Sequence, residues 1–517
     1  MRVDERWVVR AEDQRTLDRR AEASGIAEDA LMESAGTNAA TWIVDHVFPR
    51  RVAVFSGPGG NGGDALVVAR RLHEAGVDVE TFALAPSDRW SPAARRMADR
   101  LRAVDARPVR VLEDGTPPAA IDDADCIVDG LFGSGLSRPL DGPARRLVER
   151  LNGATARTIS LDLPSGLPSD CGELLGEAVR ADTTLAMAFL KPAHLLYPAA
   201  GFCGNVAVVG VDYPEATLAD AAPWARVCET AGIARRLPAR PPDGHKGTFG
   251  SVLVVAGSIG MTGAAILACR GALRAGAGLV RLAIPASLDP ILETALPETI
   301  TVPLPDTAAP GRLTPDGLDA ALLDAAIDRS DVLAIGPGLS RHPASLAAAA
   351  ALIDRFDGPI VVDADGVHAL IDRPEALARL ADRGILTPHA GEFAALADRP
   401  IPDVLADRRT AAADFAAAHR AVTVLKGRPT AIAAPDGDVF LNPTGNDALA
   451  TGGSGDVLTG LIAGFLAGGV SLVDAAVAGA YIHGLAAEAY VVERAARSMI
   501  ASDLLDLVPV VLKEIER

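Results

Sequence analysis

The chain of 517 residues is short of lysine. Lysine and arginine together number 49, but the only lysines are Lys191, Lys246, Lys426 and Lys513, which leaves 45 arginines. Arginine therefore serves wherever a plain positive charge suffices, and a compact ammonium group is expected to have a particular task at some of the four lysine positions. Lys513, near the end of the chain, is instead expected on a solvated helix.

Cysteines are also few and lie far apart, at Cys126, Cys171, Cys203, Cys228 and Cys269. Their spacing fits neither a disulfide framework nor a metal site, and it predicts a reducing cytoplasm. The first residues, MRVDERWVVRAEDQ, are too charged for a signal peptide. Residues 457 to 473 carry no charge, but glycines interrupt them and they are shorter than a typical span. We therefore expect a buried helix there and no membrane association.

The formal net charge of -18 at pH 7 excludes a broad basic face, so no nucleic acid partner is expected. An anionic small molecule can still bind where helix N-termini and backbone amides gather positive potential. The length exceeds what one hydrophobic core usually supports, and this predicts two domains.

Short β-branched runs alternate with helical stretches, which predicts an α/β fold with parallel sheets and helices on both faces. The first series of runs is RVAVFS at 51, CIVDGLF at 126, RTISLDL at 157 and NVAVVGV at 205. The second series is SVLVVAGS at 251, DVLAIGPG at 331, PIVVDAD at 359, GILTPH at 384 and AVTVLKG at 421. Prolines and small polar residues replace such runs between 212 and 247, so we expect domains at 1–222 and 223–517.

Three loops of the first series follow a strand and combine glycine with a carboxylate. FSGPGGNGGDALVVARRL runs from a strand through a glycine turn into a helix, so it is a candidate cradle for phosphate or nucleotide. Alternatively, it is a tight turn in which Asp64 caps the helix. The loops VDGLFGSGLSRPLDG and SLDLPSGLPSDCG add hydroxyl groups. Because the carboxyl ends of parallel strands meet at one sheet edge, the three loops together predict a ligand site.

In the second series, TGGSGDVLTG at residues 451 to 460 places glycines and a serine directly before Asp456 and an apolar run. If this run is a helix beginning near Asp456, its free amides form an anion hole suited to a transferring phosphoryl group. Asp456 then stands where it can accept the proton of an attacking hydroxyl, as a kinase base does. Alternatively, Asp456 only caps the helix, a role worth about 0.3–1 kcal/mol.

The first three loops and LKPAHLLYPAAGFCGNVAVVGVD resemble the NAD(P)H-hydrate epimerase domain of nicotinamide nucleotide repair enzymes, from about residue 10 to residue 213. The resemblance implies a Rossmann-like, three-layer α/β/α domain. The implied contacts to the hydrated nucleotide are Gly60, Asn61, Gly62, Gly63, Asp64, Gly133, Ser134, Gly135, Leu136, Ser137, Arg138, Pro139 and Asp162. The implied ligands of a potassium ion are Asn61, Asp129 and Ser165, whose oxygens suit a hard monovalent cation.

Asp162 is the expected catalytic residue of this domain. Inverting the hydrated ring carbon requires proton movement near it, and a partly desolvated carboxylate can provide that movement. Alternatively, Asp162 is a capping or turn residue before Pro164. The family loop reads Asn-Asn-Gly-Gly-Asp-Gly, whereas here Gly60 replaces the first Asn and Ala65 the last Gly. These departures raise the alternative of a nucleotide-binding or scaffolding module without activity.

The second domain resembles the ribokinase-like ADP/ATP-dependent NAD(P)H-hydrate dehydratases over residues 243 to 465. The motifs that carry this resemblance are HKGTFGSVLVVAGS, AIGPGL, VVDADGV, LTPHAGEF, VLKGRPT and NPTGNDALATGGSGD, in that order. The implied contacts to the hydrated dinucleotide are Ala264, Gly338, His389 and Asp456, with Asp456 as catalytic base. The implied contacts to the adenine nucleotide are Lys426, Gly427, Arg428, Pro429, Thr430 and Gly455. His389 is alternatively a structural histidine after Pro388.

Together the two resemblances imply a cytoplasmic, homo-oligomeric, bifunctional repair enzyme for hydrated NADH and NADPH (NADHX and NADPHX). The first domain would interconvert the R and S forms, and the second would dehydrate the S form at the expense of ADP or ATP, with magnesium. Phosphorylating the ring hydroxyl makes it a better leaving group, and its loss as phosphate restores the dihydronicotinamide ring. The alternative enzyme is a phosphomethylpyrimidine- or thiazole-type kinase fused to a non-catalytic nucleotide-binding domain.

Overall fold

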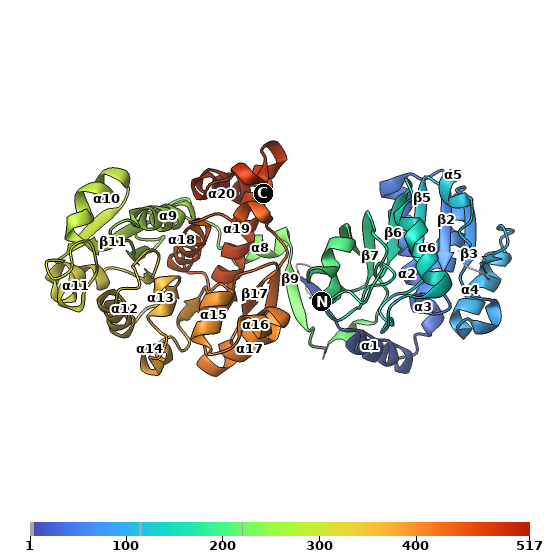
Figure 1. The fold of residues 1–517 in the computed structure, drawn as a ribbon, viewed down its shortest axis with the longest axis horizontal. Coiled ribbons are helices and arrows are strands. Elements are labelled where there is room, and N and C mark those ends of the chain that lie inside the picture. Colours follow the sequence, from blue (N-terminus) through green and yellow to red (C-terminus); the bar gives the residue numbers. More distant parts are fainter. Residues whose placement is uncertain (1–4, 113–115, 220, 517) are drawn as a thin grey trace. The chain divides into compact units, whose positions relative to one another are not determined.

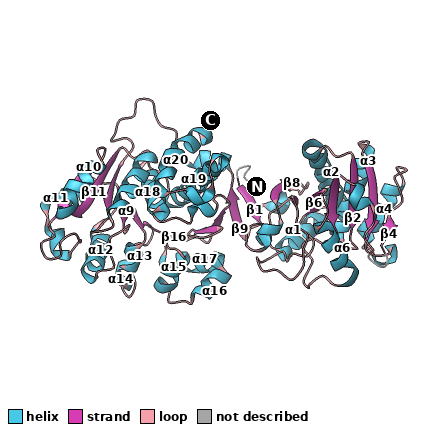
Figure 2. Ribbon diagram, turned by 45° about the horizontal axis from the view of Figure 1, so that its top comes forward, coloured by secondary structure: helices cyan, strands magenta, loops and turns pink. Residues whose placement is uncertain are grey.

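A computed structural model describes residues 5–112, 116–219 and 221–516 (Figure 1). The chain divides into two compact units, which meet in the sequence at Ala225 and Arg226. Each unit is built around its own sheet, and Figure 2 shows helices on both sides of the strands. The α/β class expected from the alternation of strand-like and helical runs is confirmed.

The first unit contains a seven-stranded parallel sheet in the order β4-β3-β2-β5-β6-β7-β8. Its strands are β2 (Arg51–Ser56), β3 (Asp78–Ala83), β4 (Arg110–Val111), β5 (Cys126–Gly130), β6 (Arg157–Leu161), β7 (Thr183–Met187) and β8 (Asn205–Val209). Side chains of the central strand β2 alternate between two apolar cores, with Val52 and Val54 in one and Ala53 and Phe55 in the other.

Helices cover both faces of this sheet. The core that contains Val54 is completed by α2 (Glu28–Val47), α3 (Gly60–Glu74) and α4 (Pro92–Arg102). The core that contains Phe55 is completed by α5 (Ala120–Asp123) and α6 (Gly142–Asn152). The unit also contains α1 (Ala11–Ala23) and α7 (Glu215–Leu218), and β1 (Glu5–Val8) precedes α1 in the chain. Backbone hydrogen bonds from Val9 N to Leu190 O and from Leu190 N to Trp7 O fix the chain that leads into α1.

The four strand-like runs expected in this unit are confirmed as β2, β5, β6 and β8. Strands β3 and β7 were not expected. In β3, DVETFA interleaves Asp78 and Glu80 with apolar residues, so it lacks an unbroken β-branched run. Strand β7 is fully buried but begins with Thr183 and Thr184, which weakens its apolar signal.

The second unit has a sheet in the order β9-β18-β17-β16-β15-β14-β13-β10-β11-β12, parallel except for β17. The five expected runs are confirmed as β10 (Ser251–Val255), β13 (Val332–Ile335), β14 (Ile360–Val362), β15 (Gly384–Leu386) and β16 (Val422–Leu425). The others are β9 (Ala225–Cys228), β11 (Leu279–Pro285), β12 (Ile300–Leu304), β17 (Thr430–Ala433) and β18 (Val439–Asn442). Strands β17 and β18 form a hairpin whose turn places Gly437 at φ 97°.

Two groups of helices lie on opposite sides of this sheet (Figures 1 and 2). One group is α9 (Thr262–Arg274), α18 (Ser454–Ala467), α19 (Leu472–Glu493) and α20 (Ala501–Ile515). The other is α12 (Pro343–Arg355), α13 (Asp365–His368), α14 (Pro374–Ala378), α15 (Ala390–Leu396), α16 (Ile401–Ala406) and α17 (Arg408–His419). The unit also contains α8 (Thr230–Arg236), α10 (Asp289–Ala295) and α11 (Ala321–Ile327).

Helix α18 is the buried helix expected after Asp456, and every residue from Val457 to Ala467 is buried. It packs closely on α9, because a Cβ on Gly460 would lie 2.2 Å from the carbonyl oxygen of Ala268. The next helix, α19, is long and apolar enough to cross a membrane by length and composition, but 72% of its most apolar window is buried inside the unit. It is therefore placed as a core helix.

The close contact of α18 with α9 predicts that Gly460→Ala lowers the free energy of unfolding of the second unit by about 1–3 kcal/mol, because backbone must move to admit the methyl group. Gly263→Ala is the matched control, since it lies on α9 with nothing within 4 Å of its Cβ position. Differential scanning calorimetry should show one transition lowered by the first change and not by the second. Equal melting temperatures for both variants would contradict the proposed packing constraint.

Candidate active sites

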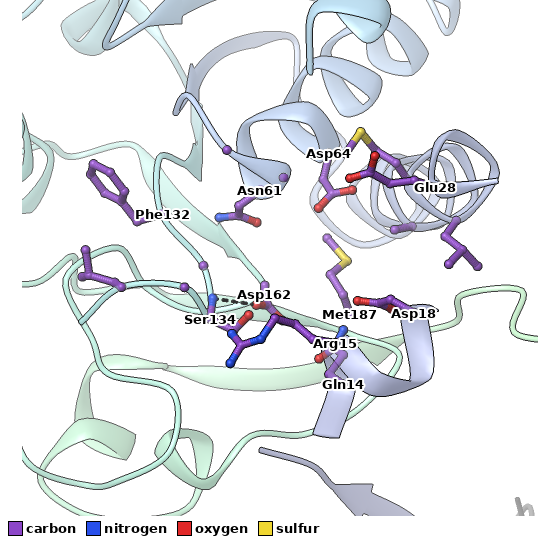
Figure 3. A pocket seen from close by; sticks show the side chains of 18 of the residues that line it. Gln14, Arg15, Asp18, Glu28, Asn61, Asp64, Phe132, Ser134, Asp162 and Met187 are labelled. Carbon is purple, nitrogen blue, oxygen red and sulfur yellow. Dashed lines mark hydrogen bonds between the residues drawn. The ribbon is translucent and has the colours of Figure 1, made fainter. Parts of the chain in front are cut away.

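A cavity of about 720 Å³ lies in the first unit at the carboxyl ends of its strands (Figure 3). Its walls come from the loops after β2 and β5, from the residues that follow β6 and β7, and from helices α1 and α2. The sequence-predicted residues that line it are Gly60, Asn61, Asp64, Gly133, Ser134, Gly135, Leu136, Ser137, Arg138 and Asp162. The three predicted loops therefore do meet at one cavity.

Gly62, Gly63 and Pro139 do not line this cavity. A Cβ on Gly62 would lie 1.9 Å from the carbonyl oxygen of Gly57, and one on Gly63 would lie 2.4 Å from Met32 Sδ. These two glycines therefore let the start of α3 pack closely against its surroundings. Glycine is therefore required at these two positions for close packing and not for contact with a ligand.

The two departures from the family loop leave the cavity intact. Ala65 is fully buried and faces Gly130, where a Cβ would lie only 2.5 Å from the Ala65 methyl group. The extra methyl is thus accommodated by a glycine behind the loop. Gly60 lines the cavity and has nothing within 4 Å of its Cβ position. The Asn side chain that the family loop carries there would therefore point into open space, and its loss disturbs no packing.

Asp162 is held by groups from three segments. Its backbone is in the left-handed region at φ 61°, and its carbonyl oxygen lies 2.7 Å from His194 Nε2. Ser134 N donates to Asp162 Oδ2 at 3.2 Å, and Lys191 Nζ donates to Asp162 Oδ1 at 2.5 Å. Burial raises the pKa of Asp162, but the Lys191 ammonium, together with His194 and Ser134 N, outweighs burial, so the net pKa lies below its ordinary value. Asp162 is therefore an ionised carboxylate at the cavity wall.

The three predicted potassium ligands lie at the base of the same loops. Asp129 is fully buried and accepts from Ser165 Oγ at 2.6 Å, from Ser165 N at 2.9 Å and from Ser160 Oγ at 2.8 Å. Asn61 is different, because both polar atoms of its carboxamide are buried without a hydrogen-bond partner among the described residues. A buried amide without partners is costly, and this one calls for a ligand that the protein itself does not supply.

Sequence reasoning missed one wall of the cavity and one partner of its catalytic candidate. The wall includes Gln14 and Asp18 on α1 and Tyr213 after β8, and the Tyr213 hydroxyl donates to Asp18. The partner is Lys191, 29 residues beyond Asp162 in the sequence. The scarcity of lysine was the one signal that could have singled Lys191 out.

In the second unit, α18 begins at Ser454 after Gly453, whose φ is 92°, and Asp456 lies in the first turn. Its neighbour Asp363 follows β14 and is buried. Asp363 accepts from Lys426 Nζ and from Thr459 Oγ1, each at 2.8 Å. A Cβ on Gly455 would lie 3.4 Å from Lys426 Nζ, so the ammonium sits against the helix start.

Asp456 does not behave as a helix cap. Its side chain makes no hydrogen bond with any residue that the structure describes, whereas Asp363 takes both nearby donors. Burial raises the pKa of Asp456 to about 7, with the Asp363 carboxylate adding to the rise and Lys426 opposing it. A carboxyl group with this pKa can exchange a proton near neutral pH, as a general base must.

The other predicted residues of this unit surround the same strand ends. His389 caps α15 through Nδ1, which accepts from Gly391 N at 3.0 Å and from Glu392 N at 3.1 Å, so its structural role is real. Its side chain is nevertheless 57% exposed. Lys426 N donates to Pro388 O at 2.9 Å, which places the two motifs side by side.

Ala264, in the first turn of α9, faces Gly338 after β13, where a Cβ would lie 2.9 Å from that of Ala264. Gly427 and Thr430 bound the turn between β16 and β17, and Thr430 Oγ1 donates to Gly427 O at 3.0 Å. Arg428 and Pro429, the remaining two predicted nucleotide contacts, lie within this turn.

The start of α18 is partly exposed, and Asp456 is not among the residues that line either described cavity. The second cavity, of about 280 Å³, lies at the far end of α18 beside Gly464 and Phe465. The predicted phosphate site therefore lies at the partly exposed start of α18, away from this second cavity.

Comparison with known proteins gives two family matches and several close relatives. A family described as NAD(P)H-hydrate dehydratase matches residues 252–510, and one described as YjeF-related protein N-terminus matches residues 28–193. The chain is 39% identical to the bifunctional NAD(P)H-hydrate repair enzyme Nnr of Moorella thermoacetica, over 99% of this chain and 97% of that protein. It is 37% identical to the enzyme of the same name from Thermofilum pendens, over 98% and 96%.

Among solved structures, the ADP/ATP-dependent NAD(P)H-hydrate dehydratase of Bacillus subtilis, co-crystallised with ATP and Mg²⁺, is 35% identical to the chain. The match covers 56% of this chain and 98% of the Bacillus subtilis chain, with a TM-score of 0.47.

The raised pKa of Asp456 predicts a pH-dependent effect of Asp456→Asn on stability. The folded state binds the Asp456 proton more tightly than the unfolded state, so this stabilisation is present below pH 3.8 and is lost as pH rises to about 7. Asparagine carries no such loss, so the variant should be the more stable protein above pH 7, and the advantage should shrink in acid. Denaturant unfolding at several pH values measures the difference.

The matched control is Asp503→Asn, because Asp503 caps α20 by accepting from Ile500 N at 2.9 Å. That variant should be destabilised by about 0.3–1 kcal/mol near neutral pH, because it removes a negative charge from the first turn of the helix. If Asp456→Asn is destabilised to the same degree above pH 7, Asp456 has the capping role instead.

Proposed function

The chain belongs to the family of bifunctional NAD(P)H-hydrate repair enzymes, and from this membership we propose how its residues divide the two reactions. The protein pairs an epimerase domain, which interconverts the R and S hydrates, with a dehydratase domain that restores NAD(P)H. A kinase fused to a silent domain does not fit, because the identity to repair enzymes extends over both units. We assign residues 1–222 to epimerisation and residues 223–517 to dehydration.

The dehydratase proposal rests on one observation, the carboxyl group of Asp456. It lies at the partly exposed start of α18, and its pKa is raised to about 7. Asp456 accepts the proton of the ring hydroxyl, whose oxygen then attacks the terminal phosphate of ADP or ATP. The amides of residues 452–456 stabilise the migrating phosphoryl group, while Lys426 adds a fixed positive charge. Release of phosphate and a ring proton then restores the dihydronicotinamide ring.

Nucleotide and magnesium are assigned to the same strand ends. Residues 426–430 and Gly455 hold the adenine nucleotide, and Ala264, Gly338 and His389 hold the hydrate. Among the described residues, no group of three or more His, Cys, Asp or Glu side chains forms a metal cluster. This fits magnesium that arrives with the nucleotide, because Mg²⁺ is commonly bound through substrate phosphates and only one or two carboxylates.

In the epimerase domain, the cavity of about 720 Å³ receives the hydrate, and Asp162 is the catalytic base. We assign Asn61, Asp129 and Ser165 to a potassium ion, which would neutralise the buried Asp129 carboxylate and tie three loops together. The unpartnered carboxamide of Asn61 supports this assignment. The intact cavity around Gly60 and Ala65 supports an active epimerase rather than a silent module.

The same proposal places the enzyme in the cytoplasm. All five cysteines are free thiols, and four of them are buried, as expected where disulfides do not form. The homo-oligomer that the family resemblance implies is open to a direct check by size-exclusion chromatography with light scattering.

A mixture of both hydrate epimers tests the two activities in one assay. With ADP or ATP and magnesium, the wild-type enzyme should restore the full dihydronicotinamide absorbance. Asp162→Asn should stall near half of that signal, because the R form is no longer converted, and Asp456→Asn should give no recovery. A reaction without enzyme corrects for spontaneous epimerisation. Full recovery by Asp162→Asn at the wild-type rate, or phosphorylated hydrate accumulating without elimination, would refute the proposal.

The potassium assignment predicts that replacing K⁺ by tetramethylammonium slows epimerisation, because the Asn61 carboxamide and the Asp129 carboxylate lose their shared cation. Dehydration of the pure S form provides the internal control. Asn61→Ala should make epimerisation slow and no longer responsive to K⁺. Potassium should also raise the melting temperature of the first unit in wild type but not in this variant. If K⁺ changes neither the epimerisation rate nor the melting temperature of the wild-type first unit, the potassium site is excluded.

A further inference from the structure

Two of the carboxyl groups that line the cavity of the first unit, Asp64 and Asp162, come from different elements. Asp64 stands near the start of α3, just beyond its first turn, and Asp162 follows β6 (Figure 3). Their surroundings differ sharply. Asp162 has Lys191 and Ser134 N on its two oxygens, whereas the Asp64 carboxyl makes no hydrogen bond or ion pair with any residue that the structure describes. One acid is therefore fixed, and the other is left available to a ligand.

Lys191 is fully buried, and every donor of its ammonium group is used. Besides Asp162 Oδ1, it donates to Phe189 O at 3.1 Å and to Met187 O at 3.3 Å. Its backbone N donates to His194 Nδ1 at 3.0 Å, and the other ring nitrogen of His194 bonds the Asp162 carbonyl. Lys191 has no donor left for substrate, so it can act only through Asp162.

On the basis of the proposed epimerase function, we propose that Asp64 is a second catalytic residue, which donates a proton opposite Asp162, and that Lys191 is the positioning residue that keeps Asp162 as the proton acceptor. Nothing in the family resemblance gave Lys191 a role, and it gave Asp64 only a contact. The assignment turns two neighbouring acids into an acid and base pair.

The electrostatics of the cavity agree with this division. Burial raises the pKa of Asp64 well above its ordinary value, and the carboxylates of Asp162 and Asp18 raise it further. The Lys191 ammonium has the opposite effect on the pKa of Asp162. His194 stays neutral, because burial and Lys191 lower its pKa to about 4. The other charged groups that line the cavity are Arg15, Arg19, Glu22, Glu28 and Arg138. Two acids with pKa values driven apart are the usual mark of an acid and base pair.

The chemistry of the hydrate has a use for both groups. The hydrated carbon carries the hydroxyl and lies beside the ring nitrogen, so it is a hemiaminal. As Asp162 removes the hydroxyl proton, the carbon–oxygen bond becomes a carbonyl and the carbon–nitrogen bond breaks. Its electron pair goes to nitrogen, which takes the proton of Asp64. Rotation of the freed carbonyl arm exposes its other face, and ring closure reverses both transfers, which inverts the carbon and resets both acids.

Asp64→Asn tests the donor directly. Epimerisation of the purified R form should lose about 100-fold or more in kcat with little change in KM, because an amide of the same size cannot supply the proton. Dehydration of the S form by the same chain reports that the second unit is folded, and a melting transition of the first unit that is not lowered reports that the fold around Asp64 is kept. Asp18 is the alternative proton donor, because it also lines the cavity and burial raises its pKa, so Asp18→Asn is measured alongside. Near wild-type epimerisation by Asp64→Asn, or a larger loss in Asp18→Asn, would overturn the proposal.

The pH profile of epimerisation tests Lys191. Without the ammonium, burial raises the pKa of Asp162, so Lys191→Met should move the acid limb of kcat/KM towards neutral pH. A merely structural role would lower the rate without moving that limb, and an unmoved limb would refute the positioning role. If Lys191→Met does not fold, the wild type still tests both roles. Its acid limb must lie below the ordinary range of an aspartate, because Asp162 is held ionised, and its rate must fall at alkaline pH as Asp64 loses its proton.

The same experiments separate two kinds of failure. If wild-type enzyme interconverts purified epimers no faster than buffer alone, the proposed epimerase function fails. If wild type epimerises but its alkaline limb is missing, only the role given to Asp64 fails; an acid limb that Lys191→Met leaves in place removes only the role given to Lys191.

Discussion

Each unit of this protein pairs a lysine ammonium with a buried aspartate at the carboxyl ends of its strands. Lys191 pairs with Asp162 in the first unit, and Lys426 pairs with Asp363 in the second. A buried charge is tolerated only when it is paired and hydrogen-bonded, so each lysine fixes the loops that carry its partner. The chain has only four lysines among its 49 lysine and arginine residues, and two of the four form these pairs. The remaining two, Lys246 and Lys513, are exposed.

The two pairs have opposite consequences for the acid that does the chemistry. In the first unit the lysine holds the catalytic candidate itself, so Asp162 stays ionised. In the second unit the lysine holds a neighbour, and burial raises the pKa of the unpaired Asp456, with the Asp363 carboxylate adding to the rise. Desolvation acts on both acids, and only the one that is bonded to a lysine is held as a fixed anion.

The fold was largely readable from the sequence, but the contacts of the sites were not. Unbroken β-branched runs marked nine strands correctly. The hairpin of β17 and β18 was missed although Pro435, Asp436 and Gly437 form a turn signal between its strands. Glycine patterns located the loops, yet they could not separate Gly60, which faces the cavity, from Gly62, which serves close packing. That difference depends on neighbours distant in sequence.

The pairing of Lys191 with Asp162 likewise depends on tertiary structure, because the left-handed backbone at Asp162 turns its carboxyl towards a residue beyond the next strand. The account as a whole depends on the charge next to each acid. Its most direct test is the acid limb of the pH profile for dehydration of the S form in wild type and in Asp363→Asn. Loss of the Asp363 charge should move that limb to lower pH, because one cause of the raised pKa of Asp456 is removed. A limb that stays in place or moves to higher pH would contradict the account.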